Sequence, residues 1–153
     1  MIKGSALSPL RTGLIMITVA GLAIQAYVHL DLASTYDVVK SSTLSQGDLF
    51  RVEAALAIVA GLALLVRPRR WTASIALLVS AGGFAAVLLY QYVDVGAIGP
   101  LPNMYDPVQY GEKTLSVWAE GTAAVASLTL FAVLHVQARR AAVTQSRTTA
   151  PAR

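Results

Sequence analysis

The chain has 153 residues, of which 56% are hydrophobic and 13% are charged, and its formal net charge is +4. Soluble domains usually carry about 25% charged residues, so the composition excludes an ordinary water-soluble domain and indicates one domain in a lipid bilayer. The absence of cysteine excludes disulfides, thiolate metal ligands and cysteine nucleophiles.

Four apolar segments are long enough to cross the bilayer, which takes about 20 helical residues. They are residues 12–30, 49–66, 71–93 and 114–136. We expect helices because lipid offers no partner to unpaired backbone groups, and because the segments lack the alternation of barrel strands. The predicted fold is therefore an all-α bundle of four transmembrane helices, forming a single domain over residues 1–140. Small residues such as Gly21 and Gly83 are expected to let helices approach closely within the monomer.

Basic residues gather on one side of the predicted membrane. They are Lys3, Arg11, Arg67, Arg69, Arg70, Arg139, Arg140, Arg147 and Arg153, whereas all carboxylates lie on the other side or in the adjoining helix halves. The positive-inside rule therefore predicts a plasma (inner) membrane protein whose N and C termini are cytoplasmic. The basic segments lack the interleaved aromatics of single-strand binders, so we expect no nucleic-acid partner. The polar, basic tail at residues 141–153 is expected to be disordered.

Two loops lie on the opposite, outer side. The first, at about residues 31–48, is polar, and Asp48 is a candidate N-cap for the second helix. The second, at about residues 94–113, contains three prolines and three glycines together with apolar and aromatic side chains. We expect it to fold over the bundle as an ordered cap, with Tyr105 and Asp106 among its contact residues. The alternative is that Tyr105 and Tyr110 are simple interfacial anchors.

Polar side chains inside the predicted helices are concentrated in the outer half. They are Gln25, His29, Arg51, Glu53, Tyr90, Asp94 and Glu120. Burying an ionisable group in a membrane span costs free energy, so such groups are candidates for a functional site. Glu120 is the deepest carboxylate, about 9 Å along its helix. Two interpretations stay open: an ion pair of Arg51 with Glu53 or Glu120 that locks the bundle, or a site for a small molecule, an ion or a quinone headgroup.

Several cofactor classes are not expected. His29 and His135 lie at opposite ends of their helices, a membrane thickness apart, so they cannot clamp one haem. One histidine among carboxylates is a weak metal pattern, and we predict no metal site. No cofactor is therefore predicted, with a quinone as the alternative. The cytoplasmic half offers few polar groups, which disfavours a channel or transporter.

Several strings resemble a family of uncharacterised actinobacterial integral membrane proteins. They are YQYVDVGAIGPLPNMYDP at residues 90–107, Glu112-Lys113, Ala119-Glu120, HLDLA at residues 29–33 and GDLF at residues 47–50. This resemblance covers most of residues 12–136 and implies the four-helix layout but no activity. In size, helix count and a histidine late in the first helix, the layout also resembles DoxX-like membrane proteins, which implies a quinone-linked redox role as an alternative.

These observations lead to a functional prediction. We expect an accessory or binding subunit of a membrane assembly that is not an enzyme, with its polar cluster at the outer mouth of the bundle. The outer loops would contact a membrane-protein partner, and the oligomeric state stays open. The alternatives are a DoxX-like quinone-linked redox protein and a small-solute or ion transporter.

Overall fold

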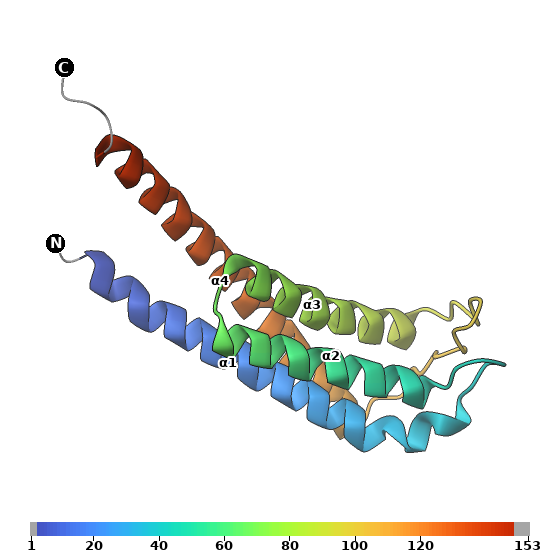
Figure 1. The fold of residues 1–153 in the computed structure, drawn as a ribbon. Coiled ribbons are helices and arrows are strands. Elements are labelled where there is room, and N and C mark those ends of the chain that lie inside the picture. Colours follow the sequence, from blue (N-terminus) through green and yellow to red (C-terminus); the bar gives the residue numbers. More distant parts are fainter. Residues whose placement is uncertain (1–2, 149–153) are drawn as a thin grey trace.

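The computed structural model describes residues 3–148, and within that range the chain is all-helical, without a β-strand (Figure 1). Helix α1 spans Lys3–Ala33, α2 spans Gln46–Val66, α3 spans Arg70–Tyr92 and α4 spans Gly111–Thr148. A short 3-10 helix, η1, follows α1 at Thr35–Val38. All four α-helices are long and apolar enough to cross a membrane. The prediction of an all-α, four-helix protein is confirmed.

The helices run alternately up and down, and both ends of the described chain lie at the same end of the bundle (Figure 1). The short turn at residues 67–69 lies at this end too, which we call the turn end. Residues 34–45 and 93–110 form the opposite, loop end. Helix α1 packs against α2 and α4, and α3 packs against α4, whereas α2 and α3 pack less extensively against each other.

Small side chains form much of the interior, and large apolar side chains cover the outside. Ala54, Ala57 and Ala76 are buried in one core cluster with Leu22 and Leu130. All four helices expose large apolar side chains; Leu78 of α3, for example, is 72% exposed. Water would oppose this arrangement, whereas lipid tails favour it, so the surface fits a multi-pass membrane protein.

Helices α1, α2 and α4 are longer than the sequence indicated, whereas α3 has the predicted length. Helix α1 begins at Lys3 rather than residue 12 and includes Pro9, which lacks one backbone donor. Helix α4 continues to Thr148, so residues 141–148 are helical although a disordered tail was expected there. Residues 149–153 of that expected tail lie outside the described residues. A search for apolar segments finds only the part of a helix that lipid can cover. It therefore misses the polar ends by which α1 and α4 extend beyond that part.

The N-cap of α2 differs from the predicted one. Ser45, not Asp48, is the N-cap: its hydroxyl accepts from the Asp48 amide at 2.9 Å, and the Asp48 carboxylate accepts from the Ser45 amide at 3.0 Å. Asp48 therefore occupies the third helical position of a capping box. Both residue types favour helix starts, so composition alone does not distinguish the two registers.

Candidate functional site

Buried and half-buried polar side chains from α1, α2 and α4 meet near the loop end. Gln25 Nε2 donates to Glu53 Oε1 at 2.7 Å, and Ser116 Oγ donates to Glu120 Oε1 at 2.9 Å. His29 joins the two pairs, because its Nε2 lies 3.9 Å from Glu120 Oε1 and its Nδ1 lies 2.9 Å from the Gln25 backbone oxygen. We call these five residues the polar cluster. It brings together four of the predicted site residues and adds Ser116, whose spacing of four from Glu120 on one helix was an available signal.

Helix α3 contributes to the polar cluster by lacking a side chain. A Cβ atom on Gly83 would lie 2.8 Å from Gln25 Nε2 and 3.0 Å from the Glu120 carboxyl carbon. Real Cβ atoms essentially never come that close to other heavy atoms, so glycine allows the backbone of α3 to lie against both side chains. Gln25 and Glu120 are both fully buried beneath it.

The polar cluster has unused hydrogen-bonding capacity. Gln25 Oε1 and Glu120 Oε2 are buried and have no hydrogen-bond partner within the described chain. Buried polar atoms of this kind are rare in folded proteins and each calls for an explanation. Among residues 9–145, whose side chains the structure describes, no lysine or arginine pairs with Glu53 or Glu120, and the ion pair of Glu120 in that range is with His29.

The hydrogen bonds of His29 fix its tautomer. Its Nδ1 lies 2.9 Å from the backbone oxygen of Gln25, which can only accept, so Nδ1 carries the proton. In the neutral ring Nε2 is then an acceptor. The ring also stands edge-on to Phe50, with the two ring centroids 5.0 Å apart. The neutral ring of His29 therefore presents an acceptor at Nε2 to its surroundings.

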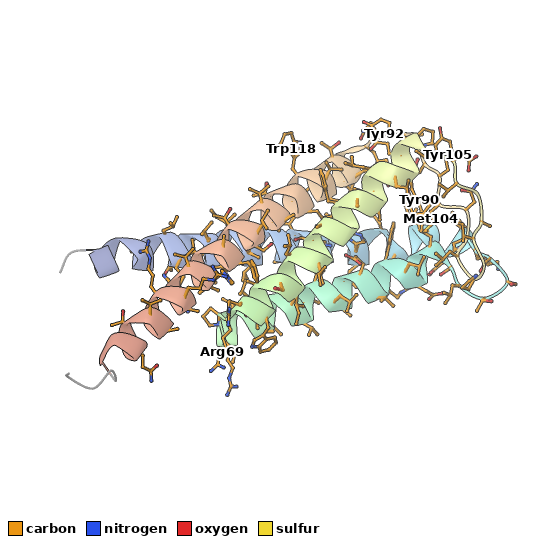
Figure 2. The ribbon with its side chains drawn as sticks, turned by 90° about the horizontal axis from the view of Figure 1, so that it is seen from above. Arg69, Tyr90, Tyr92, Met104, Tyr105 and Trp118 are labelled. Carbon is orange, nitrogen blue, oxygen red and sulfur yellow. The ribbon has the colours of Figure 1, made fainter. Side chains whose placement is uncertain are left out.

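A cavity of about 350 Å³ opens beside the polar cluster. Its polar wall includes His29, Glu53 and Ser116. Its apolar wall includes Leu49, Phe50, Gly82, Ala86, Val87 and Met104. Helices α2 and α3, the least tightly packed neighbours, supply most of this wall. Figure 2 places Tyr90 and Met104 at the inner side of the loop end, and both line the cavity. The cavity thus combines a small polar patch with a larger apolar surface.

The loop at residues 93–110 closes the top of this cavity. Its backbone is held where the Asp106 amide donates to the Tyr90 carbonyl at 2.9 Å. The Asp106 carboxylate accepts from the Tyr36 hydroxyl at 3.0 Å and lies 3.3 Å from Lys113 Nζ. Lys113 also donates to the carbonyls of Asp106 and Val108. These contacts centre on Asp106, and we call residues 93–110 the cap; Tyr105 of this loop is 41% exposed and points away from the bundle (Figure 2).

Partial burial and hydrogen bonds shift the pKa values of Asp106 and Tyr110 in the cap. Burial alone would raise the pKa of Asp106, but hydrogen bonds from Tyr36, Val108 and Lys113 hold that pKa below its ordinary value. Burial, together with the hydrogen bond between its hydroxyl and Tyr36 at 2.7 Å, raises the pKa of Tyr110. The cap therefore holds an ionised Asp106 between two neutral tyrosines at neutral pH.

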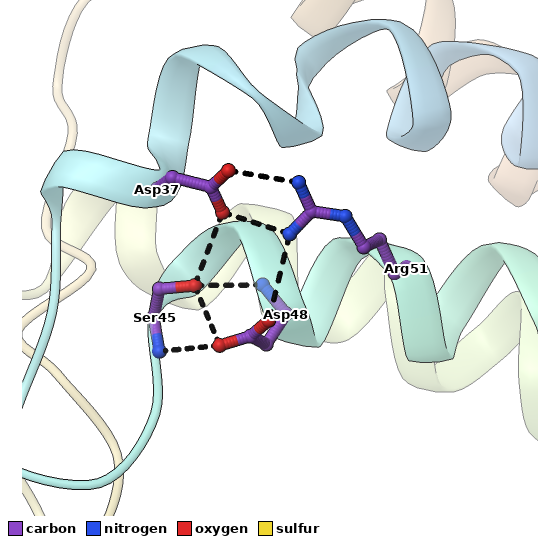
Figure 3. A network of polar contacts seen from close by, with 4 residues as sticks. All are labelled: Asp37, Ser45, Asp48 and Arg51. Carbon is purple, nitrogen blue, oxygen red and sulfur yellow. Dashed lines mark hydrogen bonds and ion pairs between the residues drawn. The ribbon is translucent and has the colours of Figure 1, made fainter.

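Three residues predicted for the cluster lie outside it: Tyr90 lines the cavity, and Arg51 and Asp94 lie in the loop-end contacts. Arg51 donates two hydrogen bonds to the Asp37 carboxylate, at 2.7 and 2.8 Å, and contacts Asp48 at 3.5 Å (Figure 3). It therefore pairs with neither Glu53 nor Glu120, the pairings that one of the two open interpretations proposed, and instead forms a clamp between η1 and α2. Asp94 accepts from the Asn103 side chain at 3.0 Å and organises the start of the cap loop.

The clamp gives a pH prediction. The Arg51 guanidinium, opposed by desolvation, holds the pKa of Asp37 below its ordinary value of 3.8. A lowered folded-state pKa contributes stability above the ordinary value, and this contribution disappears as pH falls through the folded pKa. In thermal unfolding between pH 7 and pH 3, the midpoint of Asp37→Asn should therefore approach that of the wild type below about pH 4. A constant difference between the two curves would contradict the clamp.

The described residues include no group of three metal-ligating side chains that could hold a metal ion. Comparison of the chain with protein-family models, with curated proteins and with solved structures finds no match. The chemistry of the site is therefore derived from its own residues.

Proposed function

We propose that this protein is a non-enzymatic binding subunit of the plasma membrane, with cytoplasmic termini, that holds a small amphipathic molecule in the cavity at its outer end. The observation that carries the proposal is the cavity of about 350 Å³, polar beside His29 and apolar along α2 and α3. Ligand sites are typically concave, mostly apolar and provided with few polar groups. A membrane-resident molecule with one polar head matches that pattern.

The hydrogen-bond acceptor on His29 indicates which polar group the ligand should carry. Because Nδ1 donates to the Gln25 carbonyl, Nε2 of the neutral ring is available as an acceptor, and the carboxyl group of Glu53, which lines the same cavity, offers acceptor oxygens. A hydroxyl group supplies the matching donor, whereas an ether or ester head offers acceptors only. We therefore propose a hydroxyl-bearing head, as in an alkyl phenol, a quinol or a lipid alcohol.

A matched pair of probes tests this function. In detergent micelles, 4-octylphenol should raise the unfolding midpoint more than 4-octylanisole, its methyl ether, because only the phenol donates to His29. Gly82→Leu should abolish the effect of both probes, because a Cβ at Gly82 meets nothing within 4 Å and the leucine would occupy cavity volume. His29→Phe should abolish only the difference between the probes. Equal shifts in the wild type, or shifts that persist in Gly82→Leu, would overturn the proposal.

A redox role is the second candidate, supported by one observation. The neutral imidazole of His29 faces the cavity with a carboxyl group 3.9 Å away, a pair that could accept a proton from a quinol. The electrons would pass to a partner protein. Quinol-dependent reduction of an added one-electron acceptor by membranes, lost in His29→Phe, would support this candidate, and no such reduction would remove it.

The cap supports an assembly role. Its apolar residues Ile98, Tyr105 and Val108 are exposed, Val108 by 62%, although they lie in a loop beyond the helices. Exposed apolar groups beyond the lipid region are typical of a protein contact. Extraction in mild detergent should therefore recover a membrane-protein partner, and Val108→Lys should release it. A partner that is retained by this variant would place the contact elsewhere.

A further inference from the structure

A second concavity lies at the turn end, remote from the polar cluster. It measures about 750 Å³ and is open. The basic side chains that line it are Arg11 of α1, Arg69 before α3 and Arg70 of α3. The lining from α4 is mainly apolar, with Phe131, Leu134 and Ala138 beside the polar Gln137, and α3 adds Trp71. We call this concavity the arginine groove.

Within the described part of the chain, the arginines of this groove have no carboxylate partner. Every Asp and Glu of residues 3–148 lies in the loops of the loop end or in the adjoining helix halves, and the ion pairs found in that range all involve those loop-end residues. Arg11 is nevertheless fixed, because its Nη2 donates to the Pro68 carbonyl at 3.1 Å. This bond ties α1 to the turn between α2 and α3 and leaves other guanidinium donors for a ligand.

The groove also has a defined depth. Trp71 is 52% exposed at the start of α3, the position typical of an aromatic anchor at the membrane interface. The guanidinium groups of the arginine groove therefore lie at the level of the lipid headgroups. The apolar residues Phe131 and Leu134 of α4 lie next to them, toward the membrane-spanning part of the helix. Arginine suits phosphate because it offers several donors in a planar fork.

From this juxtaposition we infer that the arginine groove binds an anionic phospholipid. The phosphate would lie among Arg11, Arg69 and Arg70, and an acyl chain would follow Phe131 and Leu134. The net positive charge of the groove favours a headgroup with no positive charge of its own, such as phosphatidylglycerol, over phosphatidylcholine. The apolar residues of the groove favour a lipid over free phosphate, because free phosphate has no acyl chain to pack against them. This site is independent of the cavity at the loop end and of the orientation in the membrane.

The two tryptophans of the chain provide the experiment. In Trp118→Phe, fluorescence reports Trp71 beside the groove; in Trp71→Phe, it reports Trp118, which lies on α4 near the loop end (Figure 2). The full chain is reconstituted in phosphatidylcholine vesicles with the same small fraction of dibrominated phosphatidylglycerol or dibrominated phosphatidylcholine. Brominated phosphatidylglycerol should quench Trp71 more strongly than the brominated control, whereas Trp118 should be quenched equally by both.

Charge variants distinguish a site from diffuse attraction. Each basic residue near a membrane surface contributes roughly fivefold to the affinity for anionic lipid. Arg69→Gln with Arg70→Gln should therefore abolish the excess quenching of Trp71. Arg139→Gln with Arg140→Gln removes the same charge beyond the groove and should leave most of the excess. Equal quenching of Trp71 by both lipids would overturn the inference, as would an equal loss in the two double variants. Loss of the excess on adding inorganic phosphate, but not sodium chloride of equal ionic strength, would assign the groove to free phosphate instead.

Discussion

Replacing Gly83 with alanine is expected to destabilise the protein by about 1–3 kcal/mol, the usual cost of overpacking. The new Cβ would overlap Gln25 Nε2 and the Glu120 carboxyl group, both buried against α3. The neighbouring Gly82→Ala is the matched control, since its Cβ meets nothing within 4 Å. That control should be neutral, or more stable by up to about 1 kcal/mol through helix propensity. Unfolding of both variants in micelles measures the difference.

A double-mutant cycle identifies the cause of the effect. If Gly83→Ala acts through the polar cluster, its cost should be smaller in a Gln25→Ala background, because the nearest overlapping atom is then absent. Additive effects of the two substitutions would mean that α3 does not lie against Gln25. Equal stability of Gly83→Ala and Gly82→Ala would contradict the close approach itself.

Replacing Lys113 with methionine is expected to release the cap. Lys113 is only 6% exposed, and its Nζ binds the carbonyls of Asp106 and Val108 as well as the Asp106 carboxylate. Removing one partner of a buried pair typically costs 3–5 kcal/mol; because the Asp106 side chain is 23% exposed, we expect about 2–3 kcal/mol here. Lys40→Met removes the same charge from an exposed residue at the same end and should cost little.

Hydrogen exchange locates the effect of this substitution. The Asp106 amide donates to the Tyr90 carbonyl, so its exchange reports whether the cap is closed. Lys113→Met should accelerate exchange at Asp106 far more than at the buried amides of α2, while Lys40→Met leaves both unchanged. Slow exchange at Asp106 in Lys113→Met would show that other contacts, such as that of Ser41 with the Pro100 carbonyl, are sufficient.

The sequence could predict the helices and the depth of the polar side chains, because both follow from apolar length and from the helical rise. Gln25, His29, Glu53 and Glu120 do meet, since antiparallel helices bring equal depths together. The partner of Arg51 was not predictable. Arg51 lies at nearly the same depth as Glu53. However, its side chain points outward from α2 to Asp37, which follows α1 in a connection whose path cannot be predicted from sequence periodicity.

Residues of the cap were the hardest to assign from the sequence. Lys113 was counted as a loop charge, yet it starts α4 and turns inward to the cap. The role of Tyr36 could not be predicted from the sequence, because its contact with Asp106 joins residues 70 positions apart. Gly83 was expected to permit close packing, but the sequence does not indicate that its neighbours are the amide and carboxyl groups of the polar cluster.

Native mass spectrometry of the protein gently extracted from its own membrane tests the central claim most directly. We predict a small molecule of discrete mass, bearing a hydroxyl group, on the wild type, and its absence from Gly82→Leu prepared in parallel. Phospholipid held in the arginine groove would appear on both proteins and so is not confused with the cavity ligand. Identical spectra for the two proteins, with phospholipid alone bound, would contradict the claim that the cavity at the loop end is a binding site.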